Sequence, residues 1–97
     1  MKVTVIGIAW YRREDYSRLL EVFPDAQKLP EIYDDWLKGA ELGERKLSSS
    51  GVRVIRIVVE PDEFTRWCQS AGCDLDANAR TRFASERVAH IVGVQNN

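Results

Sequence analysis

The sequence predicts an α+β domain with two β-strands and four helices in the order β-α-α-β-α-α, and three observations lead to it. The chain has 97 residues, of which 44% are hydrophobic, enough for one small core and too little for two domains. Two runs rich in β-branched residues, 3–10 and 52–59, have the length and composition of strands. Four further segments place apolar residues three, four and seven positions apart, as in an amphipathic helix. Residues 1–97 therefore form a single predicted domain.

The first half of the chain is expected to be β-α-α. Its strand reads VTVIGIAW and is largely apolar on both faces, so it needs cover on both sides. A first helix is expected over residues 14–23, because two acids stand at its start and Pro24 blocks its continuation. A second helix is expected over residues 30–47, where a proline takes the first helical position and an apolar stripe follows.

The second half of the chain repeats this order. Its strand reads VRVIRIVV. Pro61 opens the third helix, and Gly72 is expected to end that helix in a left-handed cap. Asp76 is expected to cap the fourth helix, which runs to about Val92 before Gly93 ends it.

The two halves also resemble each other residue by residue. The strands share four identical residues in six aligned positions, and residues 14–18 match residues 62–66 in the order acid, acid, aromatic, hydroxyl, arginine. One interpretation is a duplicated βαα unit that divides the domain into repeats 1–48 and 49–93. The other is that short strands and helices look alike because the same residue types favour them.

The small sheet predicts a partner. Two strands alone are marginal, so we expect helices on one face and a second chain that extends the sheet or covers the other face. A symmetric homodimer is the commonest arrangement of this kind. Large aromatic residues support the expectation because they are enriched at interfaces; the relevant ones are Trp10, Tyr11, Tyr33 and Trp36.

Composition narrows the classes of function. The chain has 14 Lys and Arg against 15 Asp and Glu, so it lacks the basic surplus of nucleic-acid-binding proteins. Arg80 and Arg87 share a helix face, but they form too short a stripe to change this. No apolar run approaches the roughly 18 residues that cross a bilayer, and the first residues lack a secretory pattern. We expect a cytoplasmic protein without a membrane or nucleic-acid partner, whose Cys68 and Cys73 stay reduced.

The ends of the two strands carry the candidate ligand-binding residues, because such ends gather functional loops and helix N-termini. The first end offers two aromatic rings and two guanidinium groups, which suit a flat ligand with a carboxylate or phosphate. The second end offers three acids. The candidates are Trp10, Tyr11, Arg12 and Arg13 at the first end and Glu60, Asp62 and Glu63 at the second. A pocket between the two ends and direct pairing of the acids with the arginines are both open interpretations.

No catalytic residue, cofactor or metal site is predicted. The sequence has no nucleophile elbow, phosphate-binding loop or dinucleotide fingerprint. Cys68 and Cys73 lie five positions apart and His90 is the single histidine, which does not match common zinc spacings. The sequence favours a non-catalytic, homodimeric interaction module whose partner is a second copy or another protein. The alternative is a small-molecule-binding protein or small enzyme with a pocket at the strand ends.

Overall fold

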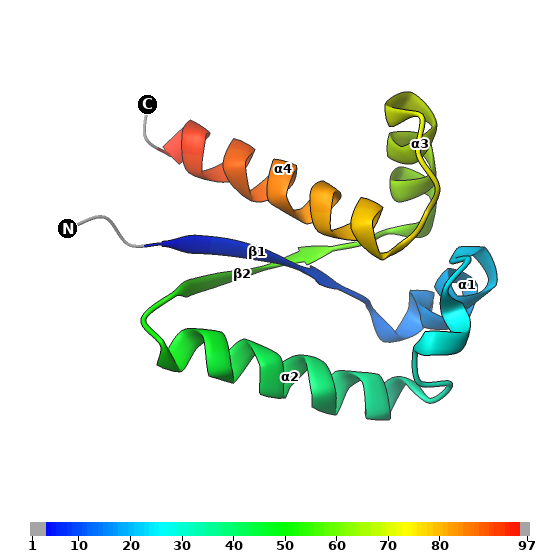
Figure 1. The fold of residues 1–97 in the computed structure, drawn as a ribbon, viewed down its shortest axis with the longest axis horizontal. Helices are drawn as coiled ribbons and strands as arrows, with labels where there is room; N and C mark the ends of the chain where they lie inside the picture. Colours follow the sequence, from blue (N-terminus) through cyan, green and yellow to red (C-terminus); the bar gives the residue numbers. More distant parts are fainter. Residues whose placement is uncertain (1–3, 96–97) are drawn as a thin grey trace.

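The structure is a computed structural model that describes residues 4–95. The predicted order β-α-α-β-α-α is confirmed, with one additional short turn of 3₁₀ helix, η1, between the first two helices (Figure 1). Residue 3, where the first strand was expected to begin, lies outside the described residues. The elements are β1 (Val5–Trp10), α1 (Arg13–Val22), η1 (Ala26–Lys28), α2 (Tyr33–Ser49), β2 (Arg53–Val58), α3 (Pro61–Ala71) and α4 (Ala77–Gln95).

The two strands form a parallel sheet that lies between two helices. The register pairs Val5 with Arg53 and Trp10 with Val58. Helix α4 covers one face of the sheet and α2 the other, while α1 and α3 lie together at the end where both strands finish (Figure 1). The expectation that the helices share one face is therefore wrong. Both faces of β1 are apolar, and the two long helices cover one each.

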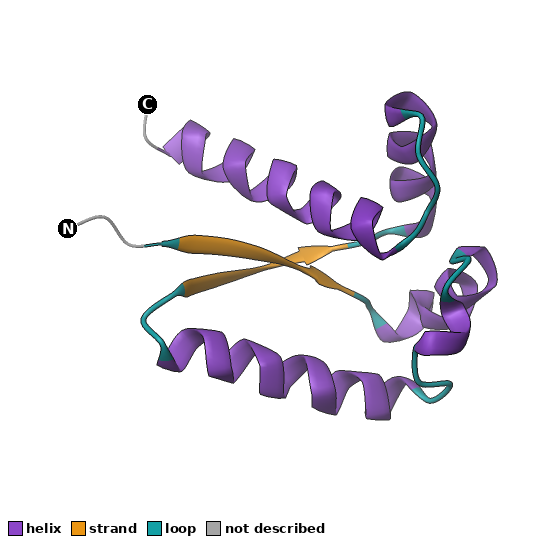
Figure 2. Cartoon of the chain, in the orientation of Figure 1, coloured by secondary structure: helices purple, strands orange, loops and turns teal. Residues whose placement is uncertain are grey.

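The pleat of the strands assigns their side chains to the two helices. A Cβ atom added at Gly7 would lie 2.7 Å from the backbone oxygen of Ala84 in α4, so the odd-numbered side chains of β1 face α4. On the other face, the Trp10 ring lies 5.2 Å from the Trp36 ring of α2. The sheet is thus enclosed above and below, but both of its edges are uncovered by any further strand among the described residues (Figure 2).

Two helix boundaries differ from the expectation for local reasons. Helix α2 begins at Tyr33 rather than at Pro30, because Leu29 and Ile32 are both extended and the residue before a proline avoids the helical region. Helix α4 continues through Gly93 to Gln95, because this glycine lacks the left-handed conformation found at Gly72. Among the described residues, no helix combines the length and hydropathy that a membrane span requires.

Candidate functional site

Aromatic side chains fill the end of the molecule where the strands finish. The chain contains three tryptophans, three tyrosines and three phenylalanines, and every one belongs to a single connected network of ring contacts. Tyr11 contacts Trp36 at 4.7 Å and Phe23 at 5.6 Å between ring centroids. Phe23 in turn contacts Phe64, 6.1 Å away, which joins the rings near α1 to those near α3. Six of these rings are buried and form part of the hydrophobic core, those of Trp10, Tyr11, Tyr16, Phe23, Phe64 and Phe83.

The two aromatic candidates of the first strand end are therefore core residues. Trp10 and Tyr11 are 7% and 5% exposed. The carbonyl oxygen of Tyr11 accepts a hydrogen bond of 2.8 Å from the Tyr33 hydroxyl, which fixes the start of α2 against this strand end. Burial raises the pKa of Tyr11 above its usual value. The rings of Trp10 and Tyr11 lie inside the protein, whereas an aromatic interface would require them on the protein surface.

The charged candidates have separate partners. Arg12 pairs with Asp15 at 2.8 Å within its own helix start, and Arg13 pairs with Asp34 of α2 at 2.6 Å. The carboxylate of Glu60 caps α3 by accepting hydrogen bonds from two backbone N–H groups, at 3.1 and 2.7 Å. The two remaining pairs are Asp62 with Arg18 and Glu63 with Arg87.

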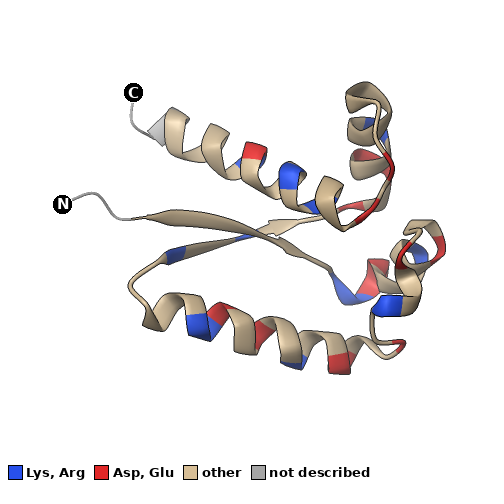
Figure 3. Cartoon of the chain, viewed as in Figure 1, with Lys and Arg blue, Asp and Glu red and all other residues tan. Residues whose placement is uncertain are grey.

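Arg12 and Arg13, the arginines predicted to face the acids of the second strand end, do not pair with them; the link between the two ends is made by a helix residue. The Arg18–Asp62 pair connects α1 with α3, so one of the three acids does pair across the two halves. Arg12 and Arg13 instead pair with the acids of α1 and α2. Figure 3 shows these charges gathered around the ends of the strands and the helices that follow them. Each of the seven candidates thus lies in the core, in an ion pair or, for Glu60, in a helix cap.

An ion pair that the sequence analysis did not identify, between the buried Arg80 and the partly exposed Asp25, lies beside the aromatic network. Arg80, which is 5% exposed, donates to both carboxylate oxygens of Asp25, at 2.9 and 2.7 Å, and also to the carbonyl oxygen of Leu75. Its guanidinium group lies 4.1 Å from the centre of the Phe23 ring. The hydrogen bonds from Arg80 hold the pKa of Asp25 below its usual value. Arg80 is therefore part of the interior and not of a basic surface stripe.

The sequence does contain a signal for this pair. Arg80 precedes Phe83 and Ala84 by three and four positions, so it lies on the same helix face as the apolar stripe of α4. An arginine in line with a buried stripe needs an acid opposite it. Which acid this is depends on the packing of α4 against the loop after α1, 55 positions away in the chain.

A concave surface lies at the opposite end of the sheet. A hollow of about 470 Å³ is lined by Val5, Ile6, Gly7, Ser85, Val88, Ala89 and Val92. The first three of these residues belong to β1 and the other four to α4. No charged side chain is among them. The hollow therefore runs along β1 and the flank of α4, away from the strand ends.

The free edge of β1 borders this hollow. The Arg53 N–H donates to the Thr4 carbonyl, and the Val59 N–H donates to the Trp10 carbonyl, both at 2.9 Å. Because successive backbone groups of a strand point in opposite directions, the intervening groups of Val5, Gly7 and Ala9 point away from β2. These outward groups have no hydrogen-bond partner within residues 4–95.

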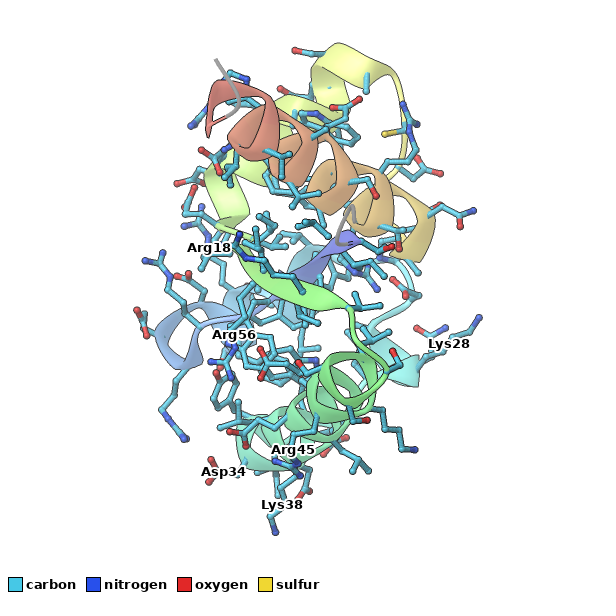
Figure 4. All side chains as sticks on the ribbon, turned by 90° about the vertical axis from the view of Figure 1, so that its left-hand side faces the viewer. Arg18, Lys28, Asp34, Lys38, Arg45 and Arg56 are labelled. Carbon is cyan, nitrogen blue, oxygen red and sulfur yellow. The ribbon has the colours of Figure 1, made fainter. Side chains whose placement is uncertain are left out.

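The two edges of the sheet differ in charge. Residues Val5–Trp10 carry no charge, whereas β2 carries the exposed Arg53 and Arg56 (Figure 3). Arg56 is held in place by a bidentate pair with Glu44, at 2.6 and 2.7 Å, and by the Trp10 ring 3.8 Å beneath it. In Figure 4, Arg56 lies between β2 and α2, while Lys38 and Arg45 extend from the far side of α2. Charged side chains protect sheet edges from pairing with other chains, and of the two strands only β2 carries them.

Comparison with protein-family models, with curated proteins and with solved structures finds no match to the chain. In the part of the chain that the structure describes, no three His, Cys, Asp or Glu side chains gather as metal ligands would.

Proposed function

We propose that this chain is a non-catalytic interaction module that forms a homodimer through the free edge of β1. In the proposed dimer the two small sheets join into one sheet of four strands, in the order β2-β1-β1-β2. The observation that carries the proposal is the edge of β1, which combines unpaired backbone groups, an apolar hollow and no charge. A two-stranded sheet gains most from additional strands.

The spacing of the outward groups suits a twofold axis. Val5, Gly7 and Ala9 alternate along the edge, with Gly7 in the middle. An antiparallel second copy centred on Gly7 would place Val5 opposite the partner's Ala9 and would satisfy all of these groups. A twofold axis at this position uses the same surface on both chains, as a closed dimer requires.

The small side chains on α4 allow this arrangement. Neighbouring strands lie about 4.8 Å apart, whereas packed helices need about 8 to 10 Å between their axes. Because each α4 lies over its own β1, the two α4 helices would meet above the joined edge, and their axes must lie about 3 to 5 Å further apart than the two strands. The flank of α4 that faces the hollow carries Ser85 and Ala89, whose small side chains suit the lower end of that range.

The size of the surface indicates a weak dimer. Six residues of β1 span about 20 Å, and together with the adjoining flank of α4 they would bury about 1,000 Å² over both copies, the lower limit for a specific interface. We therefore expect dissociation at micromolar concentration. Charge adds little to the affinity, because the surface is uncharged.

Sedimentation velocity over a concentration series tests the proposal. The wild-type chain should change from 11.1 kDa to twice that mass as its concentration rises through the micromolar range. Ala89→Lys, which places a charge in the hollow, should raise the dissociation constant at least tenfold, while His90→Lys, on the exposed neighbouring position, should leave it unchanged. A single 11.1 kDa species at every concentration would refute the dimer. Equal effects of the two lysine variants would refute this interface.

A further inference from the structure

The two cysteines lie on either side of the end of α3. This helix ends at Ala71, and Gly72 follows in the left-handed conformation with φ of 70°. The Cys73 N–H donates to the Cys68 carbonyl at 3.1 Å, and the Gly72 N–H donates to the Gln69 carbonyl at 3.4 Å. These two bonds define a Schellman motif, with Cys68 and Cys73 at its first and last positions.

A Schellman motif brings those two side chains into contact. In most proteins the contact is between apolar residues; here it is between two thiols. The Cys68 sulfur lies 3.8 Å from the carbonyl oxygen of Asp74, the residue after Cys73, so the side chain points toward the segment that contains its partner. Cys68 belongs to the buried core cluster, and Cys73 packs against that cluster.

The backbone geometry permits a bond between the two sulfur atoms. The acceptor oxygen lies about 2.4 Å and the donor nitrogen about 1.5 Å from its own Cα atom, so the 3.1 Å hydrogen bond keeps the two Cα atoms within about 7 Å. Disulfides form at Cα separations of roughly 4.4 to 6.8 Å. The motif therefore holds the pair at or near bonding distance without a change of fold.

The two thiols differ in their access to solvent. Cys68 is 1% exposed, and burial, together with the neighbouring Cys73 thiol, raises the pKa of Cys68 to about 12. It therefore remains protonated at neutral pH and reacts slowly. Cys73 is only partly buried, so it is the sulfur that a reagent in solution reaches first.

We propose that Cys68 and Cys73 are a redox-active dithiol that closes to an intramolecular disulfide by exchange with a small-molecule disulfide such as oxidised glutathione. The Cys73 thiolate attacks one glutathione sulfur and releases the other glutathione as a thiolate. Cys68 then loses its proton to that thiolate and attacks the Cys73 sulfur, which releases the second glutathione. Two protein thiols are oxidised and one small disulfide is reduced to two thiols, so atoms and electrons balance.

Mass spectrometry of the reduced protein, incubated with oxidised glutathione, tests the proposal. The wild-type chain should first gain one glutathione on Cys73 and then lose it, ending two hydrogen atoms lighter than the reduced protein. Cys68→Ala should stop at the mixed disulfide, and Cys73→Ser should form no adduct while it stays folded. The Cys68→Ala variant keeps an apolar side chain in the core, and circular dichroism confirms its fold.

Two results would overturn the proposal. In one, the wild-type chain keeps its glutathione adduct as long as Cys68→Ala does, which shows that the two sulfur atoms do not meet. In the other, oxidation gives a disulfide-linked dimer on a non-reducing gel, which shows that Cys73 pairs between chains.

Discussion

Gly7 should be the least replaceable glycine of the chain, because α4 lies directly on it. A Cβ atom at this position would lie 2.7 Å from the Ala84 backbone oxygen and 2.8 Å from the Val88 Cβ atom. Neither neighbour is the flexible end of a long side chain. Gly7→Ala therefore forces α4 away from β1, because a small local rotation cannot relieve these contacts.

The expected cost follows from two opposing effects. Overpacking of this kind costs about 1 to 3 kcal/mol, while replacing glycine by alanine recovers up to about 1 kcal/mol by restricting the unfolded chain. We expect a net loss of about 1 to 2 kcal/mol. For a chain of 97 residues this corresponds to a fall in melting temperature of roughly 4 to 16 °C.

Gly39→Ala in α2 is the matched control. A methyl group at Gly39 meets no described heavy atom within 4 Å, so alanine should stabilise this helix by about 0.5 to 1 kcal/mol. Urea unfolding of both variants at two protein concentrations separates folding from any change in dimerisation. Unchanged or increased stability of Gly7→Ala would show that α4 does not approach β1 as closely as described.

Two further predictions concern charged groups. Asp25→Asn should destabilise the fold by about 2 to 3 kcal/mol, less than the roughly 3 to 5 kcal/mol of a fully buried pair because Asp25 is partly exposed. Because the pKa of Asp25 is lowered in the folded protein, this loss should be complete above pH 5 and should begin to shrink below about pH 4, where the carboxyl group protonates in the unfolded chain. It should disappear only below the lowered pKa of the folded protein. Urea titrations from pH 3 to 7 measure the change, and a pH-independent difference would contradict the assignment. Glu60→Ala should lower the free energy of unfolding by about 1 kcal/mol, because the α3 cap is lost. Glu14→Ala is the control and should cost less, because Glu14 is an exposed acid that caps nothing in α1. Equal shifts in melting temperature of the two variants would rule out the cap.

The sequence predicts the elements of this fold well because their signals are local. Pro61 and Gly72 mark the two ends of α3 within the chain itself, and both marks are confirmed. The arrangement of helices on both faces depends on a contact that periodicity does not report. That contact is the approach of α4 to Gly7, between residues far apart in sequence.

The candidate site shows the same limit more strongly. The sequence indicates where charges and rings concentrate, but not which of them face each other. Arg13 meets Asp34 because α2 folds back beside the strand end, and Arg80 reaches Asp25 because α4 crosses the loop after α1. Each partner is set by packing between distant segments, so the residue types alone do not decide between a ligand site and a set of internal ion pairs.

The distribution of charge also explains why the interaction surface is proposed on β1 rather than at the strand ends. A surface binds a partner by removing groups from water, and this is costly when those groups are charged. At the strand ends the rings are already buried and the charges already paired, so a partner gains little there. Along β1 the backbone groups of Val5, Gly7 and Ala9 have no internal partner among the described residues, and only apolar or small side chains surround them. The proposed dimer therefore uses an edge at which binding would remove no charged side chain from water.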